Sequence, residues 1–198
     1  MKTLKTLGLL LSVMMSFSSC EFLFNQNSDV PRQAYYPLGL CFQDASGNSL
    51  AKGIGLEHWI PSDAPVEYAT RGDVIPDLYT LDILVFEPHN NIEPYVIPNA
   101  FHRRLTTNTF WGSWHLTNDF PLSVDKYPDT KKIIYRLKCP YVFGDEEVRE
   151  VVTYWTKTTK SGVNFNTECY RIEFEGNEYK ITNTGGYYTA TIVLSDDV

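Results

Sequence analysis

A short aromatic segment at residues 109–115 holds the side chains best suited to recognising a ligand. If this segment is a strand, successive side chains alternate between its faces, so Trp111 and His115 share the outward face while Trp114 points inward. An exposed indole can stack on the apolar face of a sugar ring, and nearby polar groups can hold its hydroxyls. We therefore expect a glycan-binding surface made by Trp111, His115 and Tyr95. The alternative is a half-buried strand with no ligand, because tryptophan is largely buried in most proteins.

Motifs for metal-dependent or nucleophilic catalysis are absent from the sequence. The four histidines form no His-x-His or His-Glu-x-x-His pair, which predicts no zinc site. The turn at residues 44–48 resembles the start of a calcium loop, but the sixth and twelfth positions are Ser49 and Gly55 instead of Gly and Glu. No Gly-x-Ser-x-Gly motif occurs. We expect no catalytic residue, metal or cofactor, and a hydrolase stays open only because paired carboxylates have no local signature.

Three cysteines follow Cys20 in the sequence. Alternation places Cys41 and Cys169 on the polar faces of their strands and Cys139 on an apolar face. This parity permits a disulfide between Cys41 and Cys169 if their strands are neighbours. Cys139 is then predicted to be a buried free thiol, although spacing alone does not determine connectivity.

Strands are the elements that must position these residues. Alternating apolar runs separated by turn residues predict strands at residues 35–44, 54–60, 79–86, 109–116, 131–143, 148–156, 168–175, 178–183 and 187–194. The clearest hairpin joins residues 131–143 to 148–156 through Gly144 and Asp145. After the first twenty residues, no apolar run with helical spacing exceeds about two turns. The predicted fold class is all-β, an immunoglobulin-like two-sheet β-sandwich.

The charge balance limits the class of partner. Seventeen basic residues face 24 acidic ones, for a formal net charge of −7. Nucleic acids and anionic lipids are bound through clustered Lys and Arg, and only Arg103-Arg104 and Lys131-Lys132 are dense basic sites here. We expect no nucleic-acid partner.

The first twenty residues have the pattern of an export signal. Lys2 and Lys5 precede an apolar run at residues 7–15, which is too short to span a bilayer, and small residues precede Cys20. The polar segment that follows, up to Ala34, is typical of a tether. We therefore divide the chain into a signal peptide at 1–19, a lipidated tether at 20–34 and one β-sandwich domain at 35–198.

Residues 17–20, Phe-Ser-Ser-Cys, resemble the cleavage-site pattern of bacterial lipoproteins in the looser form seen in Bacteroidota. The turn at residues 44–50 is similar to the opening hairpin of immunoglobulin-like and transthyretin-like domains that are common in Bacteroidota lipoproteins. The resemblance implies cleavage before Cys20, acylation of Cys20, and an outer-membrane lipoprotein of the cell envelope on either its periplasmic or its surface face.

These observations predict a membrane-anchored, non-catalytic lipoprotein of the cell envelope that binds a glycan or a protein. One alternative is a structural or accessory subunit of an outer-membrane complex, docked through a sheet edge or through the apolar residues 22–24. The other is the hydrolase, which requires two carboxylates that converge in a cleft.

Overall fold

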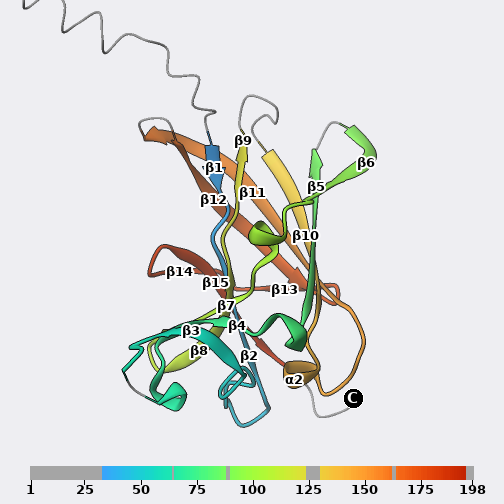
Figure 1. Ribbon diagram of the computed structural model, residues 1–198. Helices are drawn as coiled ribbons and strands as arrows, with labels where there is room; N and C mark the ends of the chain where they lie inside the picture. The colour runs from blue at the N-terminus through green and yellow to red at the C-terminus, as the bar shows by residue number, and fades with distance from the viewer. Residues whose placement is uncertain (1–32, 64, 88–89, 124–129, 162–163, 195–198) are drawn as a thin grey trace, which may run out of the picture. The chain divides into compact units, whose positions relative to one another are not determined.

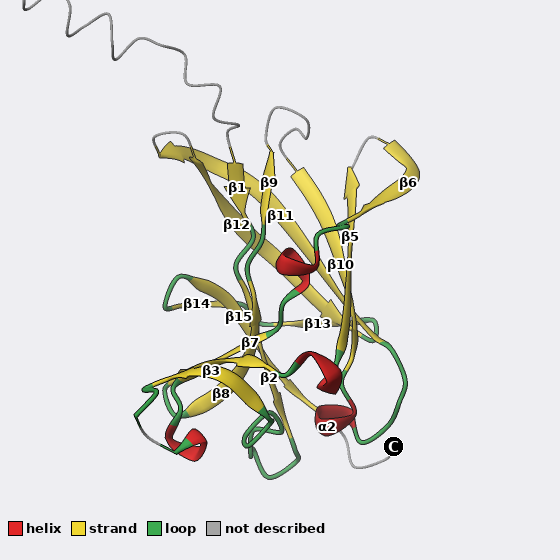
Figure 2. Cartoon of the chain, in the orientation of Figure 1, coloured by secondary structure: helices red, strands yellow, loops and turns green. Residues whose placement is uncertain are grey.

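The structure is a computed structural model that describes residues 33–63, 65–87, 90–123, 130–161 and 164–194 (Figure 1). Strands are the main regular structure of this part, and the helices are a few single turns (Figure 2). The predicted signal peptide, Cys20 and most of the predicted tether lie outside the described residues. Within the described part, no helix has the length and apolar character needed to cross a membrane.

Two sheets pack face to face. The first has the order β6 (Asn90–Val96), β5 (Thr80–Glu87), β10 (Thr130–Lys138), β11 (Arg149–Ser161), β12 (Asn164–Phe174), β1 (Gln33–Tyr35) and β9 (Pro121–Ser123), and β13 (Asn177–Tyr179) also pairs with β12. The second has the order β14 (Thr182–Thr184), β15 (Tyr187–Val193), β2 (Leu38–Gln43), β8 (Ser113–Asn118), β7 (Thr106–Phe110), β4 (Arg71–Val74) and β3 (Leu56–Ile60). The short helices are η1 (Val66–Tyr68), η2 (Pro76–Leu78), η3 (Ala100–Arg103) and α2 (Pro140–Phe143). The predicted all-β sandwich is confirmed.

The predicted central hairpin forms from β10 and β11, which pair antiparallel over eight residue positions of β10. Ile133 and Leu137 of β10 are buried, whereas Arg136, on the other face, is exposed. The prediction that the first arm continues to Phe143 is wrong, because β10 ends at Lys138 and α2 follows. Pro140 is the first residue of α2 and has no N–H with which to continue the ladder.

The first two strands belong to different sheets. β1 pairs in parallel with β12, and β2 pairs in parallel with β15. β1 begins at Gln33, so Ala34, which sequence analysis assigns to the tether, is part of the sheet and is buried. The chain therefore enters the domain as a strand that crosses from one sheet to the other.

Aromatic rings from both sheets fill the space between them. Phe42 of β2 lies 5.6 Å from Phe174 of β12, centroid to centroid. Trp155 of β11 packs edge-on against Tyr188 of β15 at 5.4 Å and donates its indole N–H to the Thr153 hydroxyl at 2.7 Å. Burying one such side chain contributes roughly 1.5–3 kcal/mol to folding. The same core therefore holds the two sheets together.

Candidate functional site

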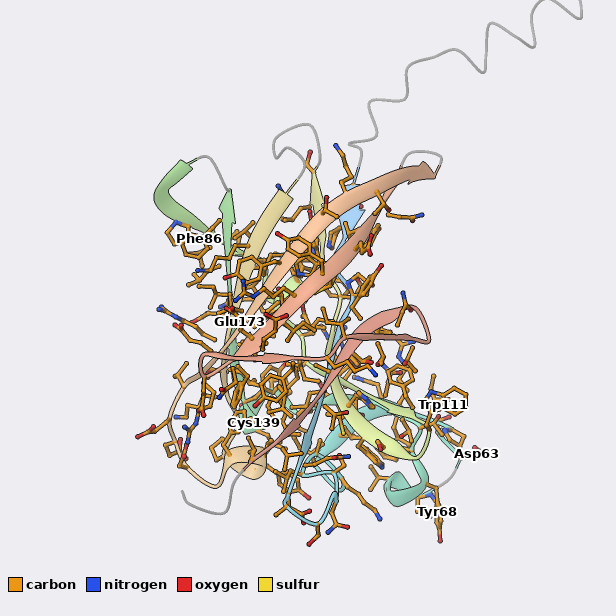
Figure 3. The ribbon with its side chains drawn as sticks, turned by 180° about the vertical axis from the view of Figure 1, so that it is seen from behind. Asp63, Tyr68, Phe86, Trp111, Cys139 and Glu173 are labelled. Carbon is orange, nitrogen blue, oxygen red and sulfur yellow. The ribbon has the colours of Figure 1, made fainter. Side chains whose placement is uncertain are left out.

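The turn between β7 and β8 presents Trp111 to solvent. Phe110 pairs with Ser113, which leaves Trp111 and Gly112 as a two-residue turn. Their φ angles are 54° and 81°, and positive φ at both central residues defines the type I′ turn. Asn-Gly is the usual pair there, because a bulky side chain is sterically disfavoured in the left-handed region. Trp111 nevertheless occupies it with 94% of its surface exposed, and Figure 3 shows its ring at the margin of the molecule.

The connection between β3 and β4 lies at the same end of the second sheet. The Thr109 N–H donates to the Thr70 carbonyl at 2.8 Å, and the Thr70 N–H donates to the Ile60 carbonyl at 2.8 Å. Ile60 and Tyr68 are 58% and 67% exposed. We call the exposed apolar side chains of these two connections the loop rim; it consists of Ile60, Val66, Tyr68 and Trp111. Ile60, Val66 and Tyr68 were not predicted as site residues. The sequence feature that could have indicated them is the loop bounded by Pro61 and Pro65.

The prediction that His115 shares an outward surface with Trp111 is wrong. His115 is buried, its ring lies 5.0 Å from the Phe110 ring, and its Nδ1 is 3.0 Å from the Ser113 carbonyl oxygen. Phe110 also packs against Tyr187 at 5.9 Å, so side chains of neighbouring hairpins cover this face of β8. Burial lowers the pKa of His115, and the Ser113 carbonyl partly opposes that effect. A neutral, buried imidazole cannot contact a ligand at the loop rim.

The remaining predicted partner of Trp111 belongs to the other sheet. Tyr95 lies in β6 of the first sheet, where its backbone pairs with Val85 of β5, and its side chain lies outside the described residues. Phe101 is 66% exposed but belongs to η3, which precedes β7, whereas Trp111 follows β7. Among the described aromatic side chains of positions 101–116, only Trp111 belongs to the loop rim.

The predicted disulfide between Cys41 and Cys169 is not formed. Both cysteines are free and buried. The prediction that Cys169 lies on the polar face is wrong, because Cys169 belongs to the core cluster, whereas Cys41 lies on the opposite face of β2 from the core residues Leu40 and Phe42. Cys139 is buried and free, as predicted. Burial raises the pKa of all three thiols, that of Cys169 to about 12. The thiolate is the nucleophile in cysteine chemistry, so these side chains are suited to packing.

Cys41 and His115 occupy neighbouring positions on two adjacent strands, β2 and β8. Leu40 pairs with Leu116, so Cys41 and His115 are the next residues on adjacent strands. Burial raises the pKa of Cys41 and lowers that of His115. Both shifts favour neutral side chains, whereas a catalytic pair requires thiolate and imidazolium.

A metal site or a relative of known function would each point to an activity. Among the described residues, no group of three or more His, Cys, Asp or Glu side chains is placed to hold a metal ion. Comparison of the chain with family models, with curated proteins and with solved structures finds no match. The loop rim is therefore the feature of the described chain from which we infer a function.

Proposed function

We propose that this chain is a non-catalytic binding module of the bacterial cell envelope, anchored by lipid at Cys20, that binds a glycan through Trp111 and the loop rim. The observation that carries the proposal is the 94% exposure of Trp111 in a turn that disfavours it. The left-handed conformation costs a residue with a side chain roughly 1–2 kcal/mol. A residue held in such a conformation at the surface supports a functional role.

The chemistry of the loop rim suits a sugar ring. The exposed indole offers an apolar surface for the C–H groups of a pyranose, and its N–H can donate to a hydroxyl. Tyr68 adds a second exposed ring with a hydroxyl, and Asp63 lies in the same corner of Figure 3. A few polar groups beside aromatic side chains are typical of sites that fix the orientation of a small ligand.

The position of the loop rim is compatible with a lipid anchor at the N-terminal end. β1 begins at the top of the view in Figure 3, whereas Trp111 lies in its lower half. A domain held to a membrane through the chain before β1 would present Trp111 away from the start of that strand. This arrangement supports a ligand outside the anchoring membrane.

The accessory-subunit alternative receives less support, because the sheet edges carry features that oppose strand addition. β6 contains Pro94 and β9 begins with Pro121, and proline cannot donate to a ladder. β3 is bulged near His58, whose φ is 50°. β14 has three residues. Prolines, bulges and short strands protect edges from pairing with another chain.

The hydrolase alternative requires carboxylates free to exchange protons. Glu150, Glu173 and Glu175 line one pocket of about 290 Å³. Each is ion-paired with an arginine: Arg136, Arg171 and Arg149, respectively. These salt bridges occupy carboxylate oxygens that a hydrolase would have to present to its substrate.

A glycan array with the full chain tests the binding proposal. We expect binding by the wild type and by Phe101→Ala, which removes an exposed ring outside the loop rim. Trp111→Ala should lose about 1–3 kcal/mol of affinity, by analogy with stacking on nucleic-acid bases, or about 5- to 150-fold. Thermal melts establish that each variant is folded. Absence of glycan binding by the wild type, or unchanged binding by Trp111→Ala, would contradict the proposal.

The anchor is tested separately through Cys20. Cys20→Ala should accumulate as unprocessed or detached protein, since its thiol can no longer be acylated. The measurement is partitioning between detergent and aqueous phases of cell extracts. Equal partitioning of wild type and variant into detergent would refute the anchor without affecting the glycan proposal.

A further inference from the structure

A second pocket, of about 510 Å³, opens on the side of the domain that carries α2. In Figure 3 the labelled Cys139, which directly precedes α2, lies on the opposite side of the view from Trp111. We call this cavity the α2 pocket. Its lining comes from α2, the β12–β13 hairpin, the end of β15 and the loop after β2, and includes Asp44, Tyr141, Phe143, Arg149, Phe174, Glu175 and Tyr179. Its volume is in the range of small-molecule sites.

Aromatic rings form the apolar part of the α2 pocket together with the aliphatic residues Leu50, Val142, Val193 and Leu194. Phe143 and Phe174 are stacked, with centroids 6.4 Å apart and an interplanar angle of 20°. Phe42 packs edge-on beneath both rings, at 5.1 Å and 5.6 Å. Tyr141 is fixed by donating its hydroxyl to the Lys52 carbonyl at 2.8 Å. These contacts give the pocket a supported wall, since its rings are held by the core of the sandwich.

Carboxylates outnumber cations around the α2 pocket. Arg149 donates to Asp145 at 2.5 Å and to Glu175 at 2.8 Å, and its guanidinium lies 5.9 Å from the Phe143 ring. The Arg149 side chain is 17% exposed, and its ion pairs with the two carboxylates hold it in place. Asp44 is a further carboxylate in the lining. The lining thus holds two carboxylates, Asp44 and Glu175, and one guanidinium, which favours a ligand of positive charge.

We propose that the α2 pocket binds a small organic cation with an apolar body, such as an aromatic amine. The ring of the ligand packs against Tyr141 and Tyr179, the least buried rings of the lining, and its ammonium lies near Glu175 and Asp44. Aromatic faces attract cations, as the placement of Arg149 over Phe143 already illustrates. This site is separate from the loop rim and does not depend on the proposed glycan-binding function.

Three probes of similar shape and different charge test the proposal: phenethylamine, 2-phenylethanol and phenylacetate. Each is titrated into the full, isotopically labelled chain in detergent, and amide shifts are followed by NMR. We expect saturable shifts at residues of α2 and of the β12–β13 hairpin. Phenethylamine should bind about tenfold more tightly than phenylacetate, which corresponds to one cation–aromatic or charge contact.

Glu175→Gln sharpens the test because it removes one carboxylate and frees one Arg149 donor. This variant should lose the preference for phenethylamine and gain affinity for phenylacetate. Glu178→Gln is the matched control: Glu178 lies in the same hairpin, outside the pocket lining, and is ion-paired with Arg171. Asp44→Asn provides a second variant in a different loop. It should weaken the binding of phenethylamine and leave the binding of the other two probes unchanged. The proposal is overturned if no probe shifts the lining residues, if phenylacetate binds the wild type best, or if Glu175→Gln and Glu178→Gln behave alike.

Discussion

The hairpin turns at Trp111-Gly112 and Glu175-Gly176 have the same backbone geometry but use it in different ways. The φ angles are 54° and 81° in the first turn and 50° and 80° in the second. Glu175 uses its position to accept a hydrogen bond from Arg149 at 2.8 Å. Within the described part of the chain, the Trp111 indole makes no hydrogen bond, ion pair or ring contact.

The two turns differ in whether an interaction within the described chain offsets the conformational cost of the left-handed residue. An interaction with Arg149 offsets part of the conformational cost at Glu175 inside the molecule. No described side-chain interaction offsets the cost at Trp111, and this difference supports the proposed contact between Trp111 and a ligand. A third turn, Gly185-Gly186, has φ angles of 58° and 85° and no side chain at either position, which provides an unstrained reference.

The largest expected effect separates the two tryptophans of the β7–β8 hairpin. Trp114 is buried, so Trp114→Ala should destabilise the fold by about 3–5 kcal/mol as a core truncation. Trp111→Ala should change stability by no more than about 0.5 kcal/mol, as is usual for exposed positions. Urea unfolding of both variants makes the measurement. Similar losses would show that Trp111 is a structural residue.

A smaller effect is expected at the reference turn. Gly185→Ala would place a Cβ 2.8 Å from Cε1 of Phe110, whose ring is already packed against His115 and Tyr187. Overpacking of this kind costs about 1–3 kcal/mol. Gly112→Ala has no atom within 4 Å of the new Cβ and isolates the cost of positive φ alone. If the two variants unfold at the same urea concentration, the Phe110 contact does not require glycine.

The next prediction is a gain in stability. Asparagine is tolerated in the left-handed region, so Trp111→Asn should stabilise the fold by up to about 1 kcal/mol. Glu175→Asn relieves the same strain but loses the Arg149 ion pair, so its net change should be smaller or unfavourable. Both changes are measured by urea unfolding at neutral pH. If Trp111→Asn is more stable than the wild type but no longer binds the ligand, the tryptophan is present for binding at the expense of stability.

Much of the fold could be predicted from the sequence, because the alternation of apolar and polar residues and the turn residues are features of short sequence segments. The β10–β11 hairpin follows from such a pattern, and Cys139 is buried on the side that parity indicates. The end of β10 could have been predicted better from Pro140, which cannot donate to a ladder. The pairing of Cys41 with Cys169 failed because the assignment of strands to sheets is a long-range property.

The candidate site was less predictable for the same reason. The predicted strand over residues 109–116 is wrong, because β7 ends at Phe110 and β8 begins at Ser113; Trp111 is exposed because it lies before Gly112 in the two-residue turn between them. Its neighbours in the loop rim come from a connection about forty residues earlier in the sequence, which is close only through the pairing of β4 with β7. The burial of His115 depends on Phe110 and Tyr187, which cover a face that alternation alone assigns to solvent.

The smallest expected effect concerns that burial and its pH dependence. Burial lowers the pKa of His115 below 6.5 in the folded chain, so the unfolded chain binds more protons as the pH falls below about 6.5. His115 therefore contributes stability above that pH, and the contribution is lost as the pH falls through its folded pKa. His115→Gln should show a shallower decrease of the urea midpoint between pH 7.5 and pH 5.5, as roughly spans the range of an ordinary imidazole. His58→Gln, at a side chain that is 77% exposed, is the matched control. If His115→Gln retains the full pH dependence of the wild type, the imidazole is not held neutral behind Phe110, and His115 returns as a candidate partner of Trp111 at the loop rim.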